Sequence, residues 1–283
     1  MRAMASAALM KVTTPAPTSP APPLCRSILG MRVHATSYDD ASSRVMAWAE
    51  GEDRRRYVCV TTVHTVMEAH DDVFLKRIVN DADLVTPDGM PLVWGLRLLG
   101  ARDAARVYGP ELTPRVLAEA ARAGVPVGFY GGAPDVLDKL VAVARERFPG
   151  LRIVYAWSPP FRPISPAEDT SIVEEINRSG ARILFVGLGC PKQDRWMAAH
   201  RSRVNAVMLG VGAAFDFLAG NKAQAPRWMQ RSGLEWLFRL SRDPGRLWRR
   251  YAVNNPLFVG LALLQLSGLR SASERQDSAR GEG

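Results

Sequence analysis

Short apolar segments that end in glycine turns, each followed by a helix-like segment, recur along most of this sequence. Residues 125–130 run into Gly131, residues 182–186 run into Gly187, and residues 206–209 reach a similar turn. These segments are apolar throughout rather than alternating, as is typical of strands that helices cover on both faces. The repeat predicts parallel strand–helix–strand units.

The whole pattern defines a single large α/β core. The predicted strands are 57–62, 83–86, 125–130, 151–156, 182–186 and 206–209. The predicted helices are 63–79, 113–123 with Thr113 as N-cap and Pro114 in the first turn, 133–148, 166–179 and one that begins near Pro191. We therefore expect a doubly wound, mostly parallel, Rossmann-like sheet over residues 28–224.

Four positions lie just after the C-terminal ends of predicted strands. They are Asp88, Gly131, Gly187 and Gly210. The carboxyl ends of parallel strands meet at one edge of a sheet, and ligands of such sheets bind beyond that edge. We expect these residues to share the edge that carries the functional site.

Asp88 stands in a Thr-Pro-Asp-Gly sequence, which is typical of a β-turn. A carboxylate at a strand end can also take a proton from a hydroxyl group. The two interpretations are compatible, because a rigid turn positions a base well. Asp88 is therefore the candidate catalytic base.

The glycine turns are candidates for nucleotide or phosphate binding, because glycine lets the backbone approach a ligand closely. The turns at Gly187 and Gly210 begin like a dinucleotide-binding fingerprint, but Lys192 and Phe215 stand where its third glycine belongs. The sequence also has no GxxxxGK[ST] loop. A structural role is equally open for these turns. The candidate phosphate-loop residues are Gly131, Gly187, Gly189 and Gly210.

No metal site or cofactor is indicated. Asp81-Ala82-Asp83 resembles the metal-binding DxD of many sugar transferases, but it precedes its strand, whereas catalytic groups should follow one. Cys190 has no histidine near it in sequence, so we discount it as a nucleophile. The four histidines have no ligand spacing. Gln193, at the start of a helix, offers a donor and an acceptor for recognition of a sugar or a base.

The segment from Pro226 to Arg250 holds seven arginines and three tryptophans against only Glu235 and Asp243. Guanidinium groups hold phosphate, and tryptophan is favoured at membrane interfaces. An apolar stretch over 256–269 follows, shorter than the ~20 residues of a spanning helix. We expect a helical, basic, membrane-proximal appendage over 225–269 that lies on the inner leaflet, although docking on the core or a homo-oligomer contact is open.

The formal charge of +9 is concentrated toward the C-terminus, which favours a localised anionic partner. We expect no nucleic acid, because zinc, RNA-binding and helix-turn-helix patterns are absent. Three cysteines without pairing signals favour a cytoplasmic location. Residues 1–27 and 270–283 are expected to be a disordered leader and tail.

Six ordered blocks resemble the WecG/TagA/CpsF family of bacterial glycosyltransferases over roughly residues 28–255. They are TPDGMPLVW (86–94), RVYGPEL (106–112), GFYGGAPDVL (128–137), VGLGCPKQDRW (186–196), GVGAAFDFLAG (210–220) and APRWMQRSGLEWLFRLSRDPGRLWRRY (225–251). The resemblance implies transfer of a sugar from a UDP-sugar to a polyprenyl-diphosphate-linked acceptor, with inversion and without a divalent metal. The donor stays open among UDP-N-acetylmannosamine, its uronic acid and UDP-glucuronate.

The resemblance also implies roles for individual residues. Asp88 would be the general base, and Thr61 would line the pocket. Polar residues near the substrates would be Arg106 and Gln193, and appendage arginines that contact the diphosphate would be Arg239, Arg246 and Arg249. Where many members carry an asparagine shortly after the threonine, this chain reads Thr62-Val63-His64, which puts sugar or acceptor specificity in question.

Two other functions are compatible with parts of this pattern. A nicotinamide-dependent dehydrogenase could use the same sheet, but the missing third glycines argue against it. A non-catalytic basic scaffold could hold lipid-linked intermediates. Replacement of Asp88 distinguishes this scaffold from a transferase, because only the transferase needs the carboxylate for turnover.

Overall fold

A computed structural model describes residues 21–267, apart from the side chains of Arg246, Arg249 and Arg250. Its centre is a six-stranded sheet in the order β4-β3-β8-β7-β5-β6, in which all neighbours are parallel. The strands are β3 (Tyr57–Thr61), β4 (Leu84–Pro87), β5 (Val127–Gly131), β6 (Ile153–Trp157), β7 (Ile183–Gly187) and β8 (Val207–Gly210). The predicted α/β, doubly wound architecture is confirmed.

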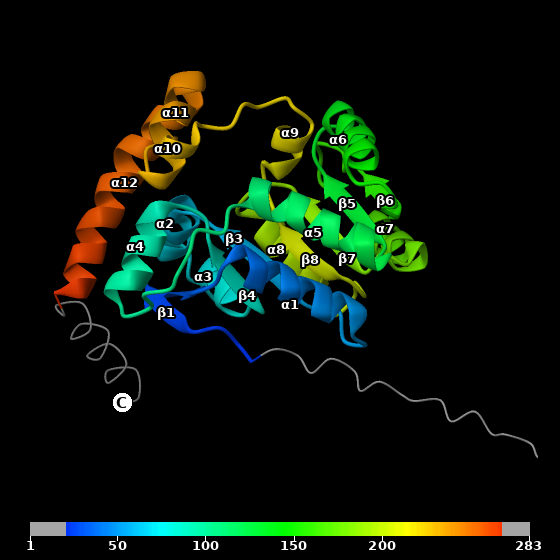
Figure 1. Cartoon of the computed structure of the whole chain (residues 1–283), viewed down its shortest axis with the longest axis horizontal. Coiled ribbons are helices and arrows are strands. Elements are labelled where there is room, and N and C mark those ends of the chain that lie inside the picture. Colours follow the sequence, from blue (N-terminus) through cyan, green and yellow to red (C-terminus); the bar gives the residue numbers. More distant parts are fainter. Residues whose placement is uncertain (1–20, 268–283) are drawn as a thin grey trace, which may run out of the picture.

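Helices cover both faces of the sheet (Figure 1). Successive strand residues point to opposite faces and so belong to two separate clusters of buried side chains. On β3, Tyr57 and Cys59 pack with one helix layer, and Val58 and Val60 pack with the other. The first layer contains α2 (Val63–Asp71), α3 (Val73–Asn80), α4 (Met90–Leu98), α7 (Pro166–Ser179) and α8 (Lys192–His200). The second contains α1 (Tyr38–Glu50), α5 (Gly109–Ala123), α6 (Pro134–Arg147) and α9 (Ala214–Leu218).

The structure corrects the predicted start of the core. An antiparallel hairpin of β1 (Cys25–Ile28) and β2 (Met31–His34) precedes α1, so part of the predicted leader is a strand. Its turn places Leu29 and Gly30 at φ values of 52° and 82°. Leucine seldom occupies that region, so the sequence lacked the usual Asn-Gly signal of such a turn. Residues 1–20 and the predicted tail lie outside the described residues.

Two predicted helices have different bounds. The single helix expected over 63–79 is divided at Asp72, whose backbone N–H ends α2 and whose side chain accepts from the Leu75 N–H at 2.9 Å to cap α3. Helix α5 begins at Gly109, before the predicted cap Thr113, whose hydroxyl instead donates to the Gly109 carbonyl. Pro110 occupies the first turn, and Pro114 lies inside the helix.

The C-terminal segment is helical, as predicted, with α10 (Arg227–Arg231), α11 (Glu235–Arg242) and α12 (Pro244–Leu266). Helix α12 runs along one side of the core beside α2 (Figure 1). Phe258 is buried in the core, and the Gln265 side chain bonds the backbone of Ser27 and Leu29. None of the described helices is long and apolar enough to cross a bilayer.

Candidate active site

Asp88 follows β4 directly, at the sheet edge where the carboxyl ends of the strands meet. Its backbone N–H donates to the carbonyl of Thr61, at the end of β3, at 2.7 Å. Gly89 then takes a φ of 131°, which a residue with a side chain seldom adopts, and α4 begins at Met90. The turn therefore fixes the position of the carboxylate.

The Asp88 carboxyl group is mostly buried and pairs with Arg106 at 3.3 Å. Burial raises its pKa to about 6, against the lowering effect of Arg106, while the neighbouring Glu235 raises it and Arg239 lowers it. A carboxyl group with such a pKa is ionised at neutral pH and basic enough to accept a proton.

Two arginines from distant segments meet at Asp88. Arg106 lies between α4 and α5, and its guanidinium group stacks on the Tyr108 ring at 4.2 Å. Arg239 comes from α11 and donates to the Tyr108 hydroxyl at 3.1 Å. Glu235, also on α11, pairs with both arginines. The appendage thus contributes charged groups to a site whose carboxylate belongs to the core.

A cleft of about 1190 Å³ opens at this edge of the sheet. Asp88, Tyr108, Arg239, the glycine turn after β7 and the N-terminal turn of α8 line it, together with residues 159–164. We call this hollow the cleft. Its aromatic wall includes Trp196, which stacks on Tyr130 at 4.3 Å, and its cations include Lys192 and Lys222.

A second, smaller hollow lies between α4 and the appendage. Its walls include Met90 of α4, Trp236 of α11, and Tyr251 and Asn255 of α12, and we call it the appendage pocket. Thr62, His64, Asp88 and Arg239 line both hollows. Asp88 therefore lies where the cleft and the appendage pocket meet.

The glycine turns divide into two groups. Gly187 and Gly189 line the cleft, whereas Gly131 and Gly210 are not among its lining residues. A Cβ atom on Gly187 would lie 2.6 Å from the Phe215 ring, and one on Gly210 would lie 2.6 Å from Met197. Tight packing is therefore a sufficient reason for glycine at positions 187 and 210. Phosphate contact at any of the four predicted phosphate-loop glycines stays a prediction.

The three predicted substrate-binding residues of the core differ in their position relative to the two hollows. Arg106 lies in the appendage pocket beside Asp88, and Gln193 lies in the wall of the cleft. The amide oxygen of Gln193 already accepts from the Gly212 N–H at 2.9 Å, so it shapes the turn after β8. Thr61 is completely buried and lines neither hollow, so its contribution is the backbone bond to Asp88.

Asp194 is a second buried carboxyl group near the cleft, and burial raises its pKa to about 6 as well. Burial is the largest cause of this shift, and interactions with the thiols of Cys59 and Cys190 lower the pKa against it. Its side chain is sealed from the cleft, since Asp194 is 2% exposed and is not a lining residue. Asp88 is therefore the carboxyl group of this pair that a substrate can reach.

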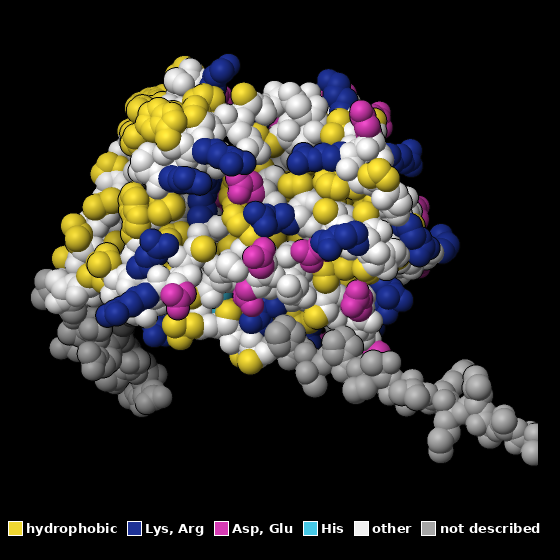
Figure 2. Space-filling model, in the orientation of Figure 1, with side chains coloured by type: hydrophobic (Ala, Val, Ile, Leu, Met, Phe, Trp, Pro, Cys, Tyr) yellow, Lys and Arg dark blue, Asp and Glu magenta, His cyan; other side chains and the backbone are white. Residues whose placement is uncertain are grey.

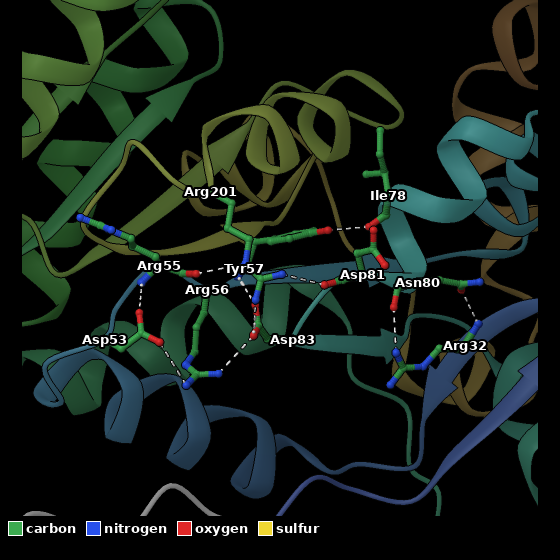
Figure 3. A network of polar contacts seen from close by, with 10 residues as sticks. All are labelled: Arg32, Asp53, Arg55, Arg56, Tyr57, Ile78, Asn80, Asp81, Asp83 and Arg201. Atoms are coloured by element: carbon green, nitrogen blue, oxygen red, sulfur yellow. Dashed lines mark hydrogen bonds and ion pairs between the residues drawn. The ribbon is translucent and has the colours of Figure 1, made fainter.

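The DxD-like Asp81 and Asp83 lie at the opposite end of β4, where Figure 3 shows a network of ion pairs. Asp83 pairs with Arg56 at 3.1 Å and Arg201 at 2.9 Å, and accepts from the Tyr57 N–H at 3.0 Å. These contacts hold the start of β4 against β3. Within residues 21–267, no three His, Cys, Asp or Glu side chains are grouped so that they could hold a metal ion.

Sequence reasoning missed Glu235, Tyr108 and Gln230 as parts of the site. Gln230 accepts from Arg106 at 3.3 Å and donates to the Ala225 carbonyl at 2.7 Å. The spacing of Glu235 and Arg239 by four helical positions was a usable signal for their pairing. No local pattern could have linked either residue to Arg106. Arg246 and Arg249 lie on α12, and their side chains are outside the described part of the structure.

A family model described as "Glycosyl transferase WecG/TagA/CpsF family" matches residues 26–272 and so covers the core and the appendage together. The match includes both segments that meet at Asp88. The chain belongs to the WecG/TagA/CpsF family of glycosyltransferases and is a glycosyltransferase.

Proposed function

We propose that this enzyme transfers a sugar from a UDP-sugar to a polyprenyl-diphosphate-linked saccharide, with inversion and without a divalent metal, in the synthesis of a surface or exported polysaccharide. One observation carries the proposal. The Asp88 carboxylate lies at the junction of the cleft and the appendage pocket, beside guanidinium groups from both the core and the appendage.

The geometry suits a single displacement. Asp88 takes the proton of the acceptor hydroxyl while that oxygen attacks the anomeric carbon of the donor. The bond from that carbon to the diphosphate breaks, and its electrons leave with UDP. One displacement from the face opposite UDP inverts the anomeric configuration, and it requires a base but no enzyme nucleophile.

The leaving diphosphate gains negative charge as this bond breaks. Arg106 and Arg239 can stabilise that charge, because both are held beside Asp88 before the substrate binds. Fixed cationic groups of this kind are typically worth ~3 kcal/mol each in the transition state. Arg246 and Arg249 are further candidates on α12.

The cleft is the proposed donor site. Its volume is ample for a nucleotide sugar. Its aromatic side chains can contact the uracil of the nucleotide. Lys192, Gly187 and Gly189 lie near the N-terminal turn of α8, where phosphate is favoured. His64 lines both hollows and contacts Asn254 of α12 at 3.4 Å, so it is a candidate for sugar specificity.

The acceptor is proposed to enter through the appendage pocket from the inner face of the cytoplasmic membrane. Apolar side chains gather over α10 and α11 and along α12 (Figure 2). Large exposed ones there are Trp228, Trp236, Leu237, Trp248, Val253, Leu257, Val259, Leu263, Leu264 and Leu266. Together with the arginines of the segment, they favour an anionic lipid surface. A homo-oligomer would bury the same residues, and binding to anionic vesicles by a monomer distinguishes the two.

The test is UDP release by the full-length protein. Purified enzyme is incubated with a panel of UDP-sugars and a short-chain polyprenyl-diphosphate saccharide, with and without a chelator. We expect acceptor-dependent release of UDP from one of N-acetylmannosamine, its uronic acid or glucuronate donors, unchanged by the chelator. Loss of all activity on chelation would refute the metal-independent mechanism, and no transfer from any UDP-sugar would refute the donor class.

A further inference from the structure

The Glu235 carboxylate bridges two arginines that come from different parts of the chain. Its Oε2 atom lies 2.5 Å from Nη2 of Arg106, and its Oε1 atom pairs with Arg239. Two guanidinium groups that converge on the oxygens of one anion are the arrangement by which arginines hold phosphate. The carboxylate thus occupies an anion-binding position.

Each arginine keeps its position through contacts other than Glu235. Arg106 stacks on Tyr108 and donates to the Gln230 amide oxygen, and Arg239 donates to the Tyr108 hydroxyl. Glu235, by contrast, has its described hydrogen bonds and ion pairs with these two arginines alone. Departure of the carboxylate would therefore leave a preorganised pair of cations.

The charges of the cluster also favour an exchange of anions. Asp88 and Glu235 balance Arg106 and Arg239 when all four are ionised. A phosphate group that enters while both carboxylates stay would leave a large negative excess in a mostly buried site, which is costly. Movement of Glu235 away from the arginines reduces that excess. Glu235 lies in the first turn of α11, beside the appendage pocket, so its side chain has an exit.

We propose that the position of the Glu235 carboxylate between Arg106 and Arg239 is a phosphate subsite, which the enzyme's own carboxylate fills until a substrate phosphate displaces it. This inference rests on the proposed function, because that reaction supplies diphosphates from the nucleotide and from the lipid. The shared chemistry is a phosphate group. Glu235 then weakens phosphate binding by competition and prevents the arginines from pairing fully with Asp88 in the free enzyme.

The test compares phosphate binding to the full-length protein and to Glu235→Gln by calorimetry. The probes are inorganic pyrophosphate, UDP and a short-chain polyprenyl diphosphate. We expect the variant to bind at least one diphosphate about tenfold more tightly, which corresponds to ~1.4 kcal/mol. Tighter binding of UDP alone assigns the subsite to the donor, and tighter binding of the lipid alone assigns it to the acceptor. Equal or weaker binding of all three probes overturns the inference.

Two further variants control this comparison. Glu68→Gln removes a carboxylate that pairs with His64 but touches neither arginine, so it should leave pyrophosphate affinity unchanged. An equal gain in Glu68→Gln would reduce the effect to general electrostatics and would contradict the subsite. Glu235→Asp keeps the charge but cannot span both arginines. If Glu235→Gln does not fold, this variant should show a smaller gain in pyrophosphate affinity, and no gain overturns the inference.

Pyrophosphate also separates this inference from the proposed function. Tighter pyrophosphate binding in a protein that transfers no sugar from any UDP-sugar supports the subsite and refutes the proposed reaction. Sugar transfer with unchanged binding of every diphosphate supports the reaction and refutes the subsite.

Discussion

Each end of β4 carries a mostly buried aspartate paired with arginine, but the two aspartates have different roles. Asp83 precedes the strand and Asp88 follows it, and their side chains are exposed by only 9% and 12%. Burial therefore does not distinguish them. Asp83 accepts from two arginines and a backbone N–H, whereas the one described ion pair of Asp88 is with Arg106, which Glu235 also holds. A fully paired carboxylate fixes a strand, and an incompletely paired one beside a cleft is available for chemistry.

The sharpest contrast between the two ends is expected in turnover. Asp88→Asn should lower kcat by about 10²–10⁴-fold, because the general base is lost. Asp83→Asn should retain the turnover of each folded molecule, since that carboxylate lies at the far edge of the sheet. UDP release per folded enzyme measures both variants. Wild-type turnover in Asp88→Asn would show that Asp88 is not the general base.

The next largest loss of activity is expected from replacement of an arginine beside Asp88. Arg239→Ala should lower kcat/KM by about 10²–10³-fold, because the leaving diphosphate loses a cation. Arg242 lies on the same helix but is exposed and contacts Phe238, so Arg242→Ala is the matched control and should retain activity. Equal losses in both variants would assign the effect to the net charge of α11 rather than to the site.

Stability should change in opposite directions at the two ends. The folded-state pKa of Asp88 is about 6 against an ordinary value of 3.8, so its ionisation costs the folded state about 3 kcal/mol at pH 8. Asp88→Asn should therefore raise the free energy of unfolding at pH 8 by up to that amount, and the gain should fade as pH falls from 6 to 4. Asp83→Asn should lower it by about 2 kcal/mol, through lost charged hydrogen bonds. Urea unfolding at several pH values measures both, and a loss of stability in Asp88→Asn would contradict the strained carboxylate.

The smallest effect is expected in the pH profile. Because the base must be ionised, kcat/KM should rise with pH, with an apparent pKa near 6, and then level off. Glu235→Gln removes a negative neighbour that raises the pKa of Asp88, so its acid limb should move to lower pH. Initial rates from pH 5 to pH 8 measure the acid limb of the wild-type enzyme and that of Glu235→Gln. A limb that moves to higher pH in Glu235→Gln would contradict this electrostatic coupling.

The sequence predicts the sheet and its functional edge because both depend on local patterns. Apolar segments that end in glycine turns are sufficient to place Asp88, Gly187 and the start of α8 at one edge. The hairpin turn at Leu29 had no such pattern, because a leucine in the sequence does not predict a residue with positive φ.

The remainder of the site depends on long-range contacts. The pairing of Arg106 with Glu235 joins residues 129 positions apart, and the Gln265 bonds that dock α12 join even more distant ones. Thr61 is another example, because the sequence could not show that the last residue of β3 is sealed and that only its backbone serves Asp88. The charged residues of the appendage were evident from the sequence, but the core residues with which they pair were not.

A crystal structure of the full-length enzyme with UDP would locate the reaction within the molecule. We expect UDP in the cleft, with an oxygen of its β-phosphate within about 4 Å of the guanidinium group of Arg106 or Arg239 and facing Asp88. UDP bound instead in the groove lined by Tyr38, Phe148 and Arg227, or with its β-phosphate directed away from Asp88, would contradict a reaction at the junction of core and appendage.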